Sequence, residues 1–376
     1  MRIRAVVLHE PRRPVRVEEV DLDPPHDDEV LVRIAAAGVC HSDLHFAEGS
    51  LGGGRWPMVL GHEGAGIVEE VGARVTHVRP GDRVAFCFVP SCGMCAQCRN
   101  GRPNLCEPAA RNALKGTLMD GTSRLRLLDG TELQHGLMTA CFADLAVVAA
   151  AGAVPFPDGL PLWQAALLGC SVVTGIGAVR NVARLAIGDT ACVIGCGGVG
   201  LQVIAGARLA GASRIVAVDR NPEKLALALR GGATDAVNGA TEDGRRAVLR
   251  ICPGGVDHAF EVVGQADTIR LAWDVVRAGG GVVVIGLAPK GVEVRLPAIE
   301  FLSEKTIRGC YYGSTNVAAA LPRLAALARD GDLDLAGVVS HFTGLDGVEE
   351  AFERLRRGDG ARTIVVVDPE LAEAPE

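Results

Sequence analysis

The sequence predicts an α/β protein made of a β-rich, barrel-like part and a doubly wound parallel sheet. Short β-rich runs broken by Pro-Pro, Gly and Gly-Asp turns occupy residues 4–88. Beyond residue 170, strand patterns alternate with helix patterns of similar length. The length of 376 residues exceeds one compact core of ordinary size, so it favours two domains.

The first part of the chain carries five β-rich runs, which are typical of a small barrel-like domain. They are Arg4 to Leu8, Val15 to Leu22, Glu29 to Ala36, Met58 to Val71 and Asp82 to Phe88. Residues 90–136 have the composition of a loop rich in Cys, Gly, Asp and Arg. A loop of that length needs something to hold it in place, and a bound metal would do so.

The second part alternates between strands and helices, and this predicts a parallel sheet with helices on both faces. Asn221-Pro222-Glu223 is an N-cap followed by a proline and an acid in the first turn, so a helix begins there. The other expected elements are the strands Thr190 to Gly195, Arg214 to Asp219, Val256 to Val262 and Gly281 to Leu287, and the helices Leu201 to Ala210 and Ala266 to Arg277. The tail from about Ser314 carries two helical runs and the strand Arg362 to Val367, and we expect it to rejoin the first domain.

Composition and charge exclude several classes of partner. The net charge is −7, and no block of Lys and Arg is interleaved with aromatics, so neither nucleic acid nor an anionic membrane is an expected partner. The first apolar run is too short for a signal peptide, and we expect no later stretch to reach the roughly 18 apolar residues of a membrane span. We therefore expect a cytoplasmic protein, in which thiols stay reduced and clustered cysteines bind metal.

Four cysteines form a C-x2-C-x2-C-x7-C pattern on the long loop. Four thiolates so close in sequence can form a closed tetrahedral shell around Zn²⁺, which leaves no position for a substrate. Buried free thiols or an iron–sulfur cluster are the alternatives, but the spacing differs from that of ferredoxins. We therefore predict a structural zinc site at Cys92, Cys95, Cys98 and Cys106.

A glycine-rich turn, G-x-G-x-x-G, follows one predicted strand and opens a helix. The glycines let the backbone approach a pyrophosphate, which the helix N-terminus binds. In a chain with 48 glycines the triplet alone is weak, but strand, turn, helix, strand and terminal acid follow in order. That acid, Asp219, would bind ribose hydroxyls and repel a 2′-phosphate, so we expect NAD, although Arg220 beside it leaves use of NADP open. The turn residues are Gly195, Gly197, Gly198, Val199 and Gly200.

A second metal site is only weakly indicated by residue type. Cys40 and His62 end β-like runs, and Cys170 precedes the alternating region. Two thiolates and an imidazole would leave a fourth position open, which is the pattern of a catalytic zinc. From spacing alone, the histidine would more often be a core or turn residue and the cysteines small buried hydrophobes.

Several motifs together resemble the zinc-containing medium-chain alcohol dehydrogenases. They are Cys40-His41-Ser42-Asp43, Gly61-His62-Glu63-Gly64-Ala65-Gly66, the four-cysteine loop, and Val193 to Gly200, in order over essentially the whole chain. Leu118 to Arg124 and the long segment to His135 resemble the longer branch of that family, which includes liver-type and formaldehyde-dehydrogenase-like bacterial enzymes. The resemblance implies a GroES-like β-barrel catalytic domain, residues 1–171 and 314–376, and a Rossmann NAD-binding domain, residues 172–313.

The resemblance also implies a role for each site residue. Cys40, His62 and Cys170 would bind the catalytic zinc, with Glu63 as an alternative or neighbouring ligand and Asp43 orienting the imidazole.

The proton path and the cofactor contacts follow from the same resemblance. Ser42 would accept the alcohol proton, which would then leave through the cofactor ribose and His45 to solvent. His41 stands where many relatives carry an arginine and would be a weaker partner for phosphate at neutral pH. The remaining implied contacts are Asp219 and Lys224 for the ribose and Arg362 for a phosphate.

The prediction is therefore a zinc-dependent, NAD-linked alcohol dehydrogenase that interconverts a primary alcohol and an aldehyde. We expect two zinc ions per chain and a homodimer joined through the Gly281 to Leu287 and Thr306 to Gly313 runs. One alternative is a dehydrogenase for S-hydroxymethyl adducts of glutathione or mycothiol, whose pocket would need polar groups such as Glu48, Arg111 or Arg124. Two others are an enzyme that keeps NAD bound while an external acceptor recycles it, and a non-catalytic NAD-binding relative.

Overall fold

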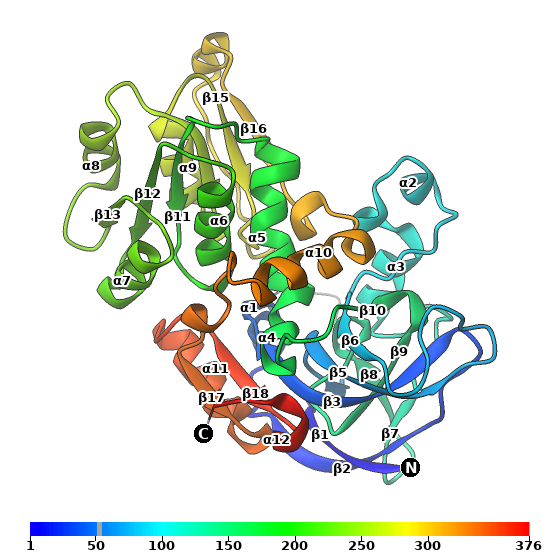
Figure 1. Ribbon diagram of the computed structural model, residues 1–376. Helices are drawn as coiled ribbons and strands as arrows, with labels where there is room; N and C mark the ends of the chain where they lie inside the picture. Colours follow the sequence, from blue (N-terminus) through cyan, green and yellow to red (C-terminus); the bar gives the residue numbers. More distant parts are fainter. Residues whose placement is uncertain (51–54, 376) are drawn as a thin grey trace. The chain divides into compact units, whose positions relative to one another are not determined.

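The computed structural model of the chain describes residues 1–50 and 55–375 (Figure 1). The chain divides into two compact units, one of Met1–Cys170 with Asn316–Glu376 and one of Ser171–Thr315. The sequence-based boundaries after residues 171 and 313 lie within two residues of this division.

The first unit contains a closed barrel and a seven-stranded sheet. The barrel order is β1 (Arg2–Leu8), β2 (Arg16–Leu22), β7 (Leu125–Leu127), β8 (Glu132–His135) and β4 (Met58–Val59). The second sheet runs β10 (Ala153–Pro155), β6 (Arg83–Phe86), β5 (Glu63–Val71), β3 (Glu29–Val39), β18 (Thr363–Val366) and β17 (His341–Thr343), with β9 (Leu145–Ala149) also paired to β3.

Strand β3 is central to this sheet because ten of its eleven residues are buried. A near-continuous apolar run is typical of a strand covered on both faces. The tail strand β18 pairs antiparallel with β3, with Thr363 opposite Val39, and the two lie side by side in red and blue in Figure 1. The C-terminal tail therefore completes the sheet that begins near the N-terminus.

Residues 90–136, expected to be a loop, contain regular elements. They include α2 (Ala96–Arg99), α3 (Glu107–Lys115) and the barrel strands β7 and β8. Helix α3 has an acid and Pro108 in its first turn and ends at Gly116 with φ 70°. These are ordinary start and stop signals, which the abundance of cysteine and glycine in the segment obscured.

The other helices of the first unit are α1 (His41–Glu48), α4 (Leu162–Leu167), α10 (Val317–Arg329), α11 (Val348–Arg357) and α12 (Pro369–Ala372).

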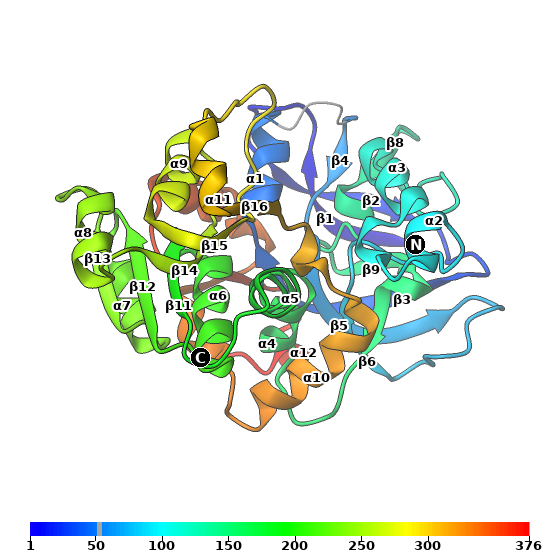
Figure 2. The same ribbon diagram turned by 90° about the horizontal axis from the view of Figure 1, so that it is seen from above.

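The second unit is a six-stranded parallel sheet with helices on both faces, and it confirms the predicted fold class. The strand order is β13 (Asp235–Asn238), β12 (Arg214–Asp219), β11 (Thr190–Ile194), β14 (Val256–Glu261), β15 (Val276–Val284) and β16 (Thr306–Gly309). In chain order this is 3-2-1-4-5-6, the Rossmann arrangement. The helices include α5 (Val173–Gly177), α6 (Gly198–Leu209), α7 (Pro222–Arg230), α8 (Gly244–Ile251) and α9 (Ala266–Val275). Helices α6 and α9 lie on opposite sides of the sheet (Figure 2).

One helical stretch differs from the expectation that no segment is long and apolar enough to cross a membrane. Leu162–Ala183 is 22 residues long and passes that test by length and composition. However, 89% of its most apolar window is buried inside the protein, as in the core helix of a soluble fold. The sequence does not predict this helix, because its alanines, glycines and β-branched residues give no clear helical period.

Candidate functional site

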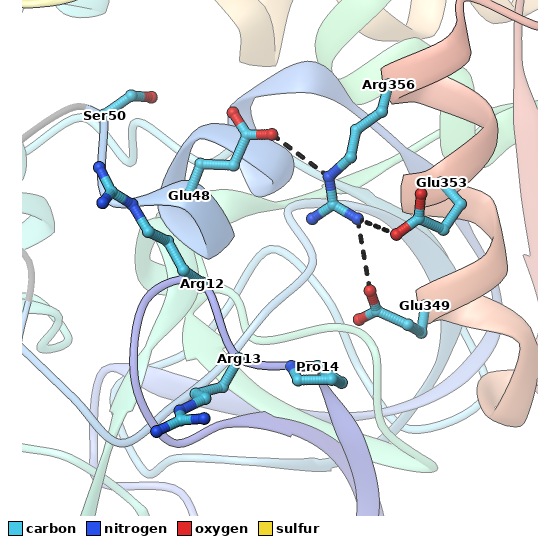
Figure 3. A pocket seen from close by; sticks show the side chains of 8 residues that line it. All are labelled: Arg12, Arg13, Pro14, Glu48, Ser50, Glu349, Glu353 and Arg356. Atoms are coloured by element: carbon cyan, nitrogen blue, oxygen red, sulfur yellow. Dashed lines mark hydrogen bonds and ion pairs between the residues drawn. The ribbon is translucent and has the colours of Figure 1, made fainter.

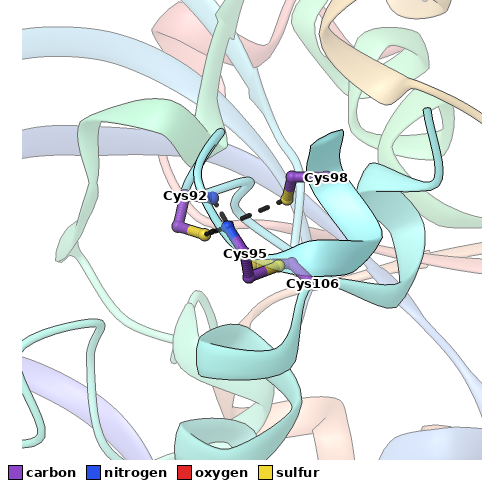
Figure 4. Close-up of side chains that lie close together, drawn as sticks. All are labelled: Cys92, Cys95, Cys98 and Cys106. Atoms are coloured by element: carbon purple, nitrogen blue, oxygen red, sulfur yellow. Dashed lines mark hydrogen bonds between the residues drawn. The ribbon is translucent and has the colours of Figure 1, made fainter. Parts of the chain in front are cut away.

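The four loop cysteines come together as the spacing predicts (Figure 4). The four sulfur atoms all lie within 4.8 Å of one another. The Cys95 N–H points to Cys92 Sγ at 3.3 Å, and the Cys92 N–H points to Cys106 Sγ at 3.4 Å. Backbone N–H groups, first that of Cys98, lower the pKa of Cys95 to about 6, whereas burial raises the pKa of Cys106 to about 12. Amide groups aimed at sulfur favour thiolates, the form that binds metal.

The loop has little apolar packing to hold it. Helix α2 buries none of its four residues. Ordering a segment of this kind costs conformational entropy that hydrophobic burial does not offset. Four converging sulfur donors fit a zinc ion, whose binding would supply the missing stabilisation.

A second cluster forms from three separate elements of the first unit. Cys40 directly precedes α1, His62 directly precedes β5, and Cys170 lies in the long helical stretch. The ligand atoms of these residues lie within 4.8 Å of one another, and all three residues are buried. Within the described residues, His62 Nε2 has no hydrogen-bond partner. Since an unsatisfied buried nitrogen is costly, the donor set of two sulfurs and this nitrogen fits a metal ion.

Asp43 fixes the geometry of this cluster. Its Oδ1 lies 3.1 Å from His62 Nδ1 and accepts from the Gly61 N–H at 3.1 Å, while Oδ2 accepts from the Cys40 N–H at 3.3 Å. Burial alone would lower the pKa of His62, but the Asp43 carboxylate outweighs it and raises that pKa well above its usual value. In the neutral ring that binds a metal, the Nδ1 proton donated to Asp43 leaves the Nε2 lone pair available as a ligand.

The two thiols of the cluster do not ionise equally. The hydrogen bond with Cys170 lowers the pKa of Cys40 well below its usual value, and the same contact raises that of Cys170. The two sulfurs therefore share a proton that a bound cation would displace.

Glu63 and Arg362 form a buried ion pair behind this cluster. The Arg362 guanidinium donates to Glu63 Oε1 at 2.9 Å and to the Val39 carbonyl oxygen at 2.8 Å. The group of close ligand atoms contains Cys40, His62 and Cys170 but not Glu63. The ligand role of Glu63 and the phosphate contact of Arg362 therefore stay predictions, and an ion pair between them is the observed feature.

Helix α1 carries the predicted proton path. Ser42 and His45 are one turn apart and half-buried, and Ser42 Oγ lies 3.8 Å from Cys40 Sγ. Burial lowers the pKa of His45, which favours the neutral ring. His41 is exposed, with its ring centroid 6.5 Å from that of His45. Ser50, which the sequence reading missed, lies 2.9 Å from His45 Nδ1 through its Oγ.

In the glycine-rich turn of the second unit, some glycines are required by the fold itself and others leave space that a ligand could use. Gly195 has φ 96°, and a Cβ on Gly200 would clash with the Gly195 carbonyl oxygen. A Cβ on Gly197, however, would meet nothing within 4 Å. Chain packing therefore requires Gly200 but not Gly197, and open space at this turn fits a pyrophosphate. Gly198 and Val199 begin α6, whose N-terminal N–H groups lie at the same turn.

Asp219 lies at the end of β12, beside this turn. Its Oδ2 accepts from the Cys196 N–H at 2.7 Å, and its Oδ1 accepts from the Asn221 N–H at 2.9 Å. The carboxylate thus also holds the turn itself, a role that the sequence did not reveal. Arg220 is exposed and Lys224 is half-buried on α7.

Two of the three polar groups expected for a thiol-adduct pocket have other partners. Arg124 is only 2% exposed and donates to both oxygens of Glu29 at 2.8 Å. Glu48 accepts from Arg356 at 3.3 Å. Arg111 is exposed on α3. Arg124 is therefore committed to an ion pair inside the barrel unit.

Two family domains match the chain. Residues 26–158 match the alcohol dehydrogenase GroES-like domain, and residues 198–327 match the zinc-binding dehydrogenase domain.

Full-length relatives agree with these matches. S-(hydroxymethyl)glutathione dehydrogenase of Escherichia coli O1:K1 / APEC is 38% identical over 97% of this chain and 100% of its own length. Benzyl alcohol dehydrogenase from Acinetobacter calcoaceticus superimposes with a TM-score of 0.92 at 29% identity, covering 98% of this chain and 100% of that one. Alcohol dehydrogenase TADH from Thermus sp. ATN1 gives a TM-score of 0.82 at 32% identity, with 97% and 100% covered.

Similarity over nearly the whole length, together with the two domain matches, settles the family. The cofactors of that family, zinc and a nicotinamide nucleotide, agree with the cysteine–histidine clusters and the glycine-rich turn. The chain therefore belongs to the zinc-dependent medium-chain alcohol dehydrogenases and is an NAD-linked oxidoreductase.

Proposed function

We propose that the protein reversibly oxidises a primary alcohol to an aldehyde, with NAD as the hydride acceptor and a catalytic zinc bound by Cys40, His62 and Cys170. The observation that carries this proposal is the buried convergence of these three ligand atoms within 4.8 Å. Asp43 supports it by holding the imidazole at Nδ1. The four-cysteine loop has no open ligand position, so its zinc would be structural.

Each partner of the reaction has a defined task. A zinc ion at this site would act as a Lewis acid that lowers the pKa of the substrate hydroxyl by several units. NAD, when bound, accepts the hydride and supplies the redox chemistry. The protein fixes the zinc ligands, excludes water from the buried cluster and removes the alcohol proton. Ser42 Oγ accepts that proton, which passes through the cofactor ribose to the neutral imidazole of His45 and from there to solvent.

Cofactor recognition is assigned to the second unit and to two groups of the first. Asp219 would accept hydrogen bonds from the ribose hydroxyls, with Lys224 nearby, and would repel a 2′-phosphate. A zinc-binding dehydrogenase from Sinorhizobium meliloti 1021, 28% identical, was solved bound to NADP. In this chain Arg220 is the candidate partner for a 2′-phosphate. Removing the repelling carboxylate in Asp219→Ala should therefore lower the ratio of activity with NAD to activity with NADP. His41 and Arg362 are the candidate phosphate contacts.

The substrate class is tested by following reduced nicotinamide during incubation with a panel of primary alcohols, and separately with formaldehyde plus glutathione or mycothiol. We expect turnover of the primary alcohols without added thiol. Turnover only with a thiol adduct would favour the second candidate, which the names of the Escherichia coli relatives support. A zinc-loaded protein that turns over none of these substrates would contradict the proposal and favour a non-catalytic NAD-binding role.

We also propose a cytoplasmic homodimer joined through the second unit. Strand β16 is an edge of the parallel sheet, and three of its four residues are exposed. Just before it, Ile299 is 71% and Leu302 is 79% exposed. An open strand edge beside exposed apolar side chains favours pairing with a second copy. Light scattering should give the mass of two chains for wild type and of one chain for Leu302→Asp.

A further inference from the structure

The end of helix α1 brings a hydroxyl to the ring of His45. Gly49 adopts φ 68° directly after the helix. The Ser50 N–H donates to the His45 carbonyl oxygen at 3.0 Å, and the Gly49 N–H donates to that of Phe46 at 3.0 Å. These two bonds form a Schellman turn. Because glycine takes this φ without strain, the Gly-Ser pair fixes where Ser50 lies.

Ser50 Oγ contacts two atoms of the same histidine. It lies 2.9 Å from His45 Nδ1 and 3.3 Å from the His45 carbonyl oxygen. A carbonyl oxygen can only accept, so the hydroxyl proton belongs to that contact and the ring nitrogen must donate. Both hydrogen bonds exist together only when the proton of the neutral ring is on Nδ1. The Nε2 atom then keeps its lone pair.

We infer that Ser50 is a positioning residue that holds neutral His45 in the Nδ1–H form, which makes Nε2 the atom that takes up the alcohol proton. The inference deepens the proposed function and rests on it, because His45 is there the last protein group of the proton path. The protons balance: Nε2 gains the alcohol proton and the ring becomes a cation, and loss of that proton from Nε2 to water restores the Nδ1–H form. The Nδ1–H bond to Ser50 is kept throughout, so Ser50 ends in the state in which it began.

Ser50 also forms part of the wall of an open hollow of about 590 Å³ (Figure 3). Figure 3 shows Arg12 near Ser50, and Glu48 beside Arg12 with its carboxylate reaching Arg356 of helix α11. The remaining lining residues are Arg13, Pro14, Glu349 and Glu353. Ser50, which contacts His45 Nδ1, therefore lies at the edge of this hollow.

The charges around His45 agree with a neutral ring that is ready to accept a proton. Burial is the largest influence and lowers the pKa of His45, while Glu48 and Cys40 oppose it. From other elements, Arg12 and Arg356 line the hollow beside Ser50. His41 lies on the same helix with its ring centroid 6.5 Å away.

The tautomer can be measured directly by nitrogen NMR on zinc-loaded protein containing ¹⁵N-labelled histidine, without NAD. Protonated and unprotonated ring nitrogens have well-separated shifts, and His45→Gln assigns the signals among the nine histidines. We expect the proton on Nδ1 in wild type and in Ser50→Thr. In Ser50→Ala the Nε2–H form should gain population. A wild-type ring protonated on Nε2 would overturn the inference, whatever the variants do.

Kinetics provide the second readout. A general base contributes roughly 10²–10⁴-fold to the rate. Ser50→Ala keeps the base and loses only its orientation, so kcat/KM for the alcohol should fall about tenfold near neutral pH. The acid limb of the pH profile of kcat/KM should also shift. Ser50→Thr should restore most of the rate.

The matched control is Ser213→Ala, which removes an exposed hydroxyl that donates to the Gly188 carbonyl oxygen at 2.6 Å. It should leave the pH profile unchanged. A Ser50→Ala enzyme with wild-type zinc content, tautomer and pH profile would refute the role of Ser50. Failure of the proposed function can be told apart from failure of this inference. In the first case wild type would oxidise no alcohol, while the ring proton of His45 located by NMR would still be on Nδ1.

Discussion

The four-cysteine loop and the Cys40–His62–Cys170 cluster lie in the same unit but are built in opposite ways. The loop draws its ligand atoms from residues 92–106 and leaves three of its four cysteines partly exposed. The second cluster draws three buried residues from three segments, and Cys170 lies more than a hundred residues beyond the other two. On the proposed assignment the loop depends on a bound metal for its order, whereas the buried cluster has a packed surrounding and a carboxylate that orients its histidine.

This difference explains which site the sequence could predict. Four cysteines on one loop share their chemistry within a few residues, so spacing alone predicts a closed zinc site. Cys170 comes near Cys40 only because β3 and the long helical stretch pack in one unit, and no local pattern encodes that approach. The resemblance to a family was needed to bring the three residues together.

The largest effect should come from removing a ligand of the buried cluster. Cys40→Ser should lose one zinc ion and reduce kcat by about a thousandfold or more, since Lewis-acid activation supplies several kcal/mol and each 1.36 kcal/mol is a factor of ten. Its thermal unfolding should stay close to wild type. Zinc analysis and turnover measure both properties. Full activity in the variant would show that the reaction does not need this cluster.

The complementary change is Cys98→Ser in the loop. We expect loss of one zinc ion and a free energy of unfolding lower by several kcal/mol, because the metal stabilises only the folded loop. Limited proteolysis should cut near Arg99 and Arg102, while protein that remains folded keeps most of its kcat. If activity fell as far as in Cys40→Ser with no loss of stability, the assignment of the loop as structural would be wrong.

A smaller effect is expected from changing Asp43, which contacts the predicted zinc ligand His62. Asp43→Asn keeps the shape but removes the charge that holds His62 at Nδ1. Such partners typically contribute 10- to 100-fold in metal affinity or activity. Titration with a chelator should show faster zinc loss from the buried cluster only. Unchanged zinc retention would mean that the packing around His62 is enough to hold the imidazole without the Asp43 carboxylate.

A second buried histidine shows what Asp43 contributes. Among the described residues, no carboxylate hydrogen-bonds to the ring of His135: Nε2 accepts from the Arg124 N–H at 3.2 Å, and burial lowers the pKa of this histidine to about 3. Since the folded pKa lies below the ordinary value of 6.5, the unfolded chain takes up the proton first as the pH falls. The stability linked to this group is complete above pH 6.5 and is lost progressively between pH 6.5 and 3.

His135→Gln should therefore flatten the dependence of stability on pH. Below pH 6.5 wild type should lose roughly 1 kcal/mol per pH unit more than the variant, until the folded pKa is reached. Denaturant unfolding at pH 7, 6 and 5 measures the free energy of unfolding of both proteins. Because any effect of pH on the zinc sites is common to both, it cancels in the comparison. Parallel curves would exclude a neutral buried His135.

Much of the fold could be predicted from local patterns. The turn at Gly195 to Gly200, Asp219 at the end of β12 and the N-cap Asn221 were all readable, and Asn221 accepts from the Glu223 N–H as an N-cap should. Strands β13 and β16 and helix α8 were missed, because each is short and only partly buried. The helix from Leu162 to Ala183 was missed because it is apolar all round.

The site was less predictable than the fold. The second role of Asp219, holding the Cys196 N–H, and the ion pair of Glu63 with Arg362 depend on contacts across strands. Ser50 could have been suspected from the Gly-Ser pair after the helix, but its contact with His45 Nδ1 needs the folded turn. Side chains joined by tertiary packing leave no spacing rule in the sequence.

The most direct test of two zinc sites with different shells is X-ray absorption at the zinc edge, with metal content measured on the same samples. Wild type should hold two zinc ions with about three sulfur ligands each on average, from one four-sulfur and one two-sulfur shell. Cys40→Ser should hold one zinc in a four-sulfur shell, and Cys98→Ser one zinc with two sulfurs and nitrogen. A single zinc in wild type, or the same shell in both variants, would contradict the account.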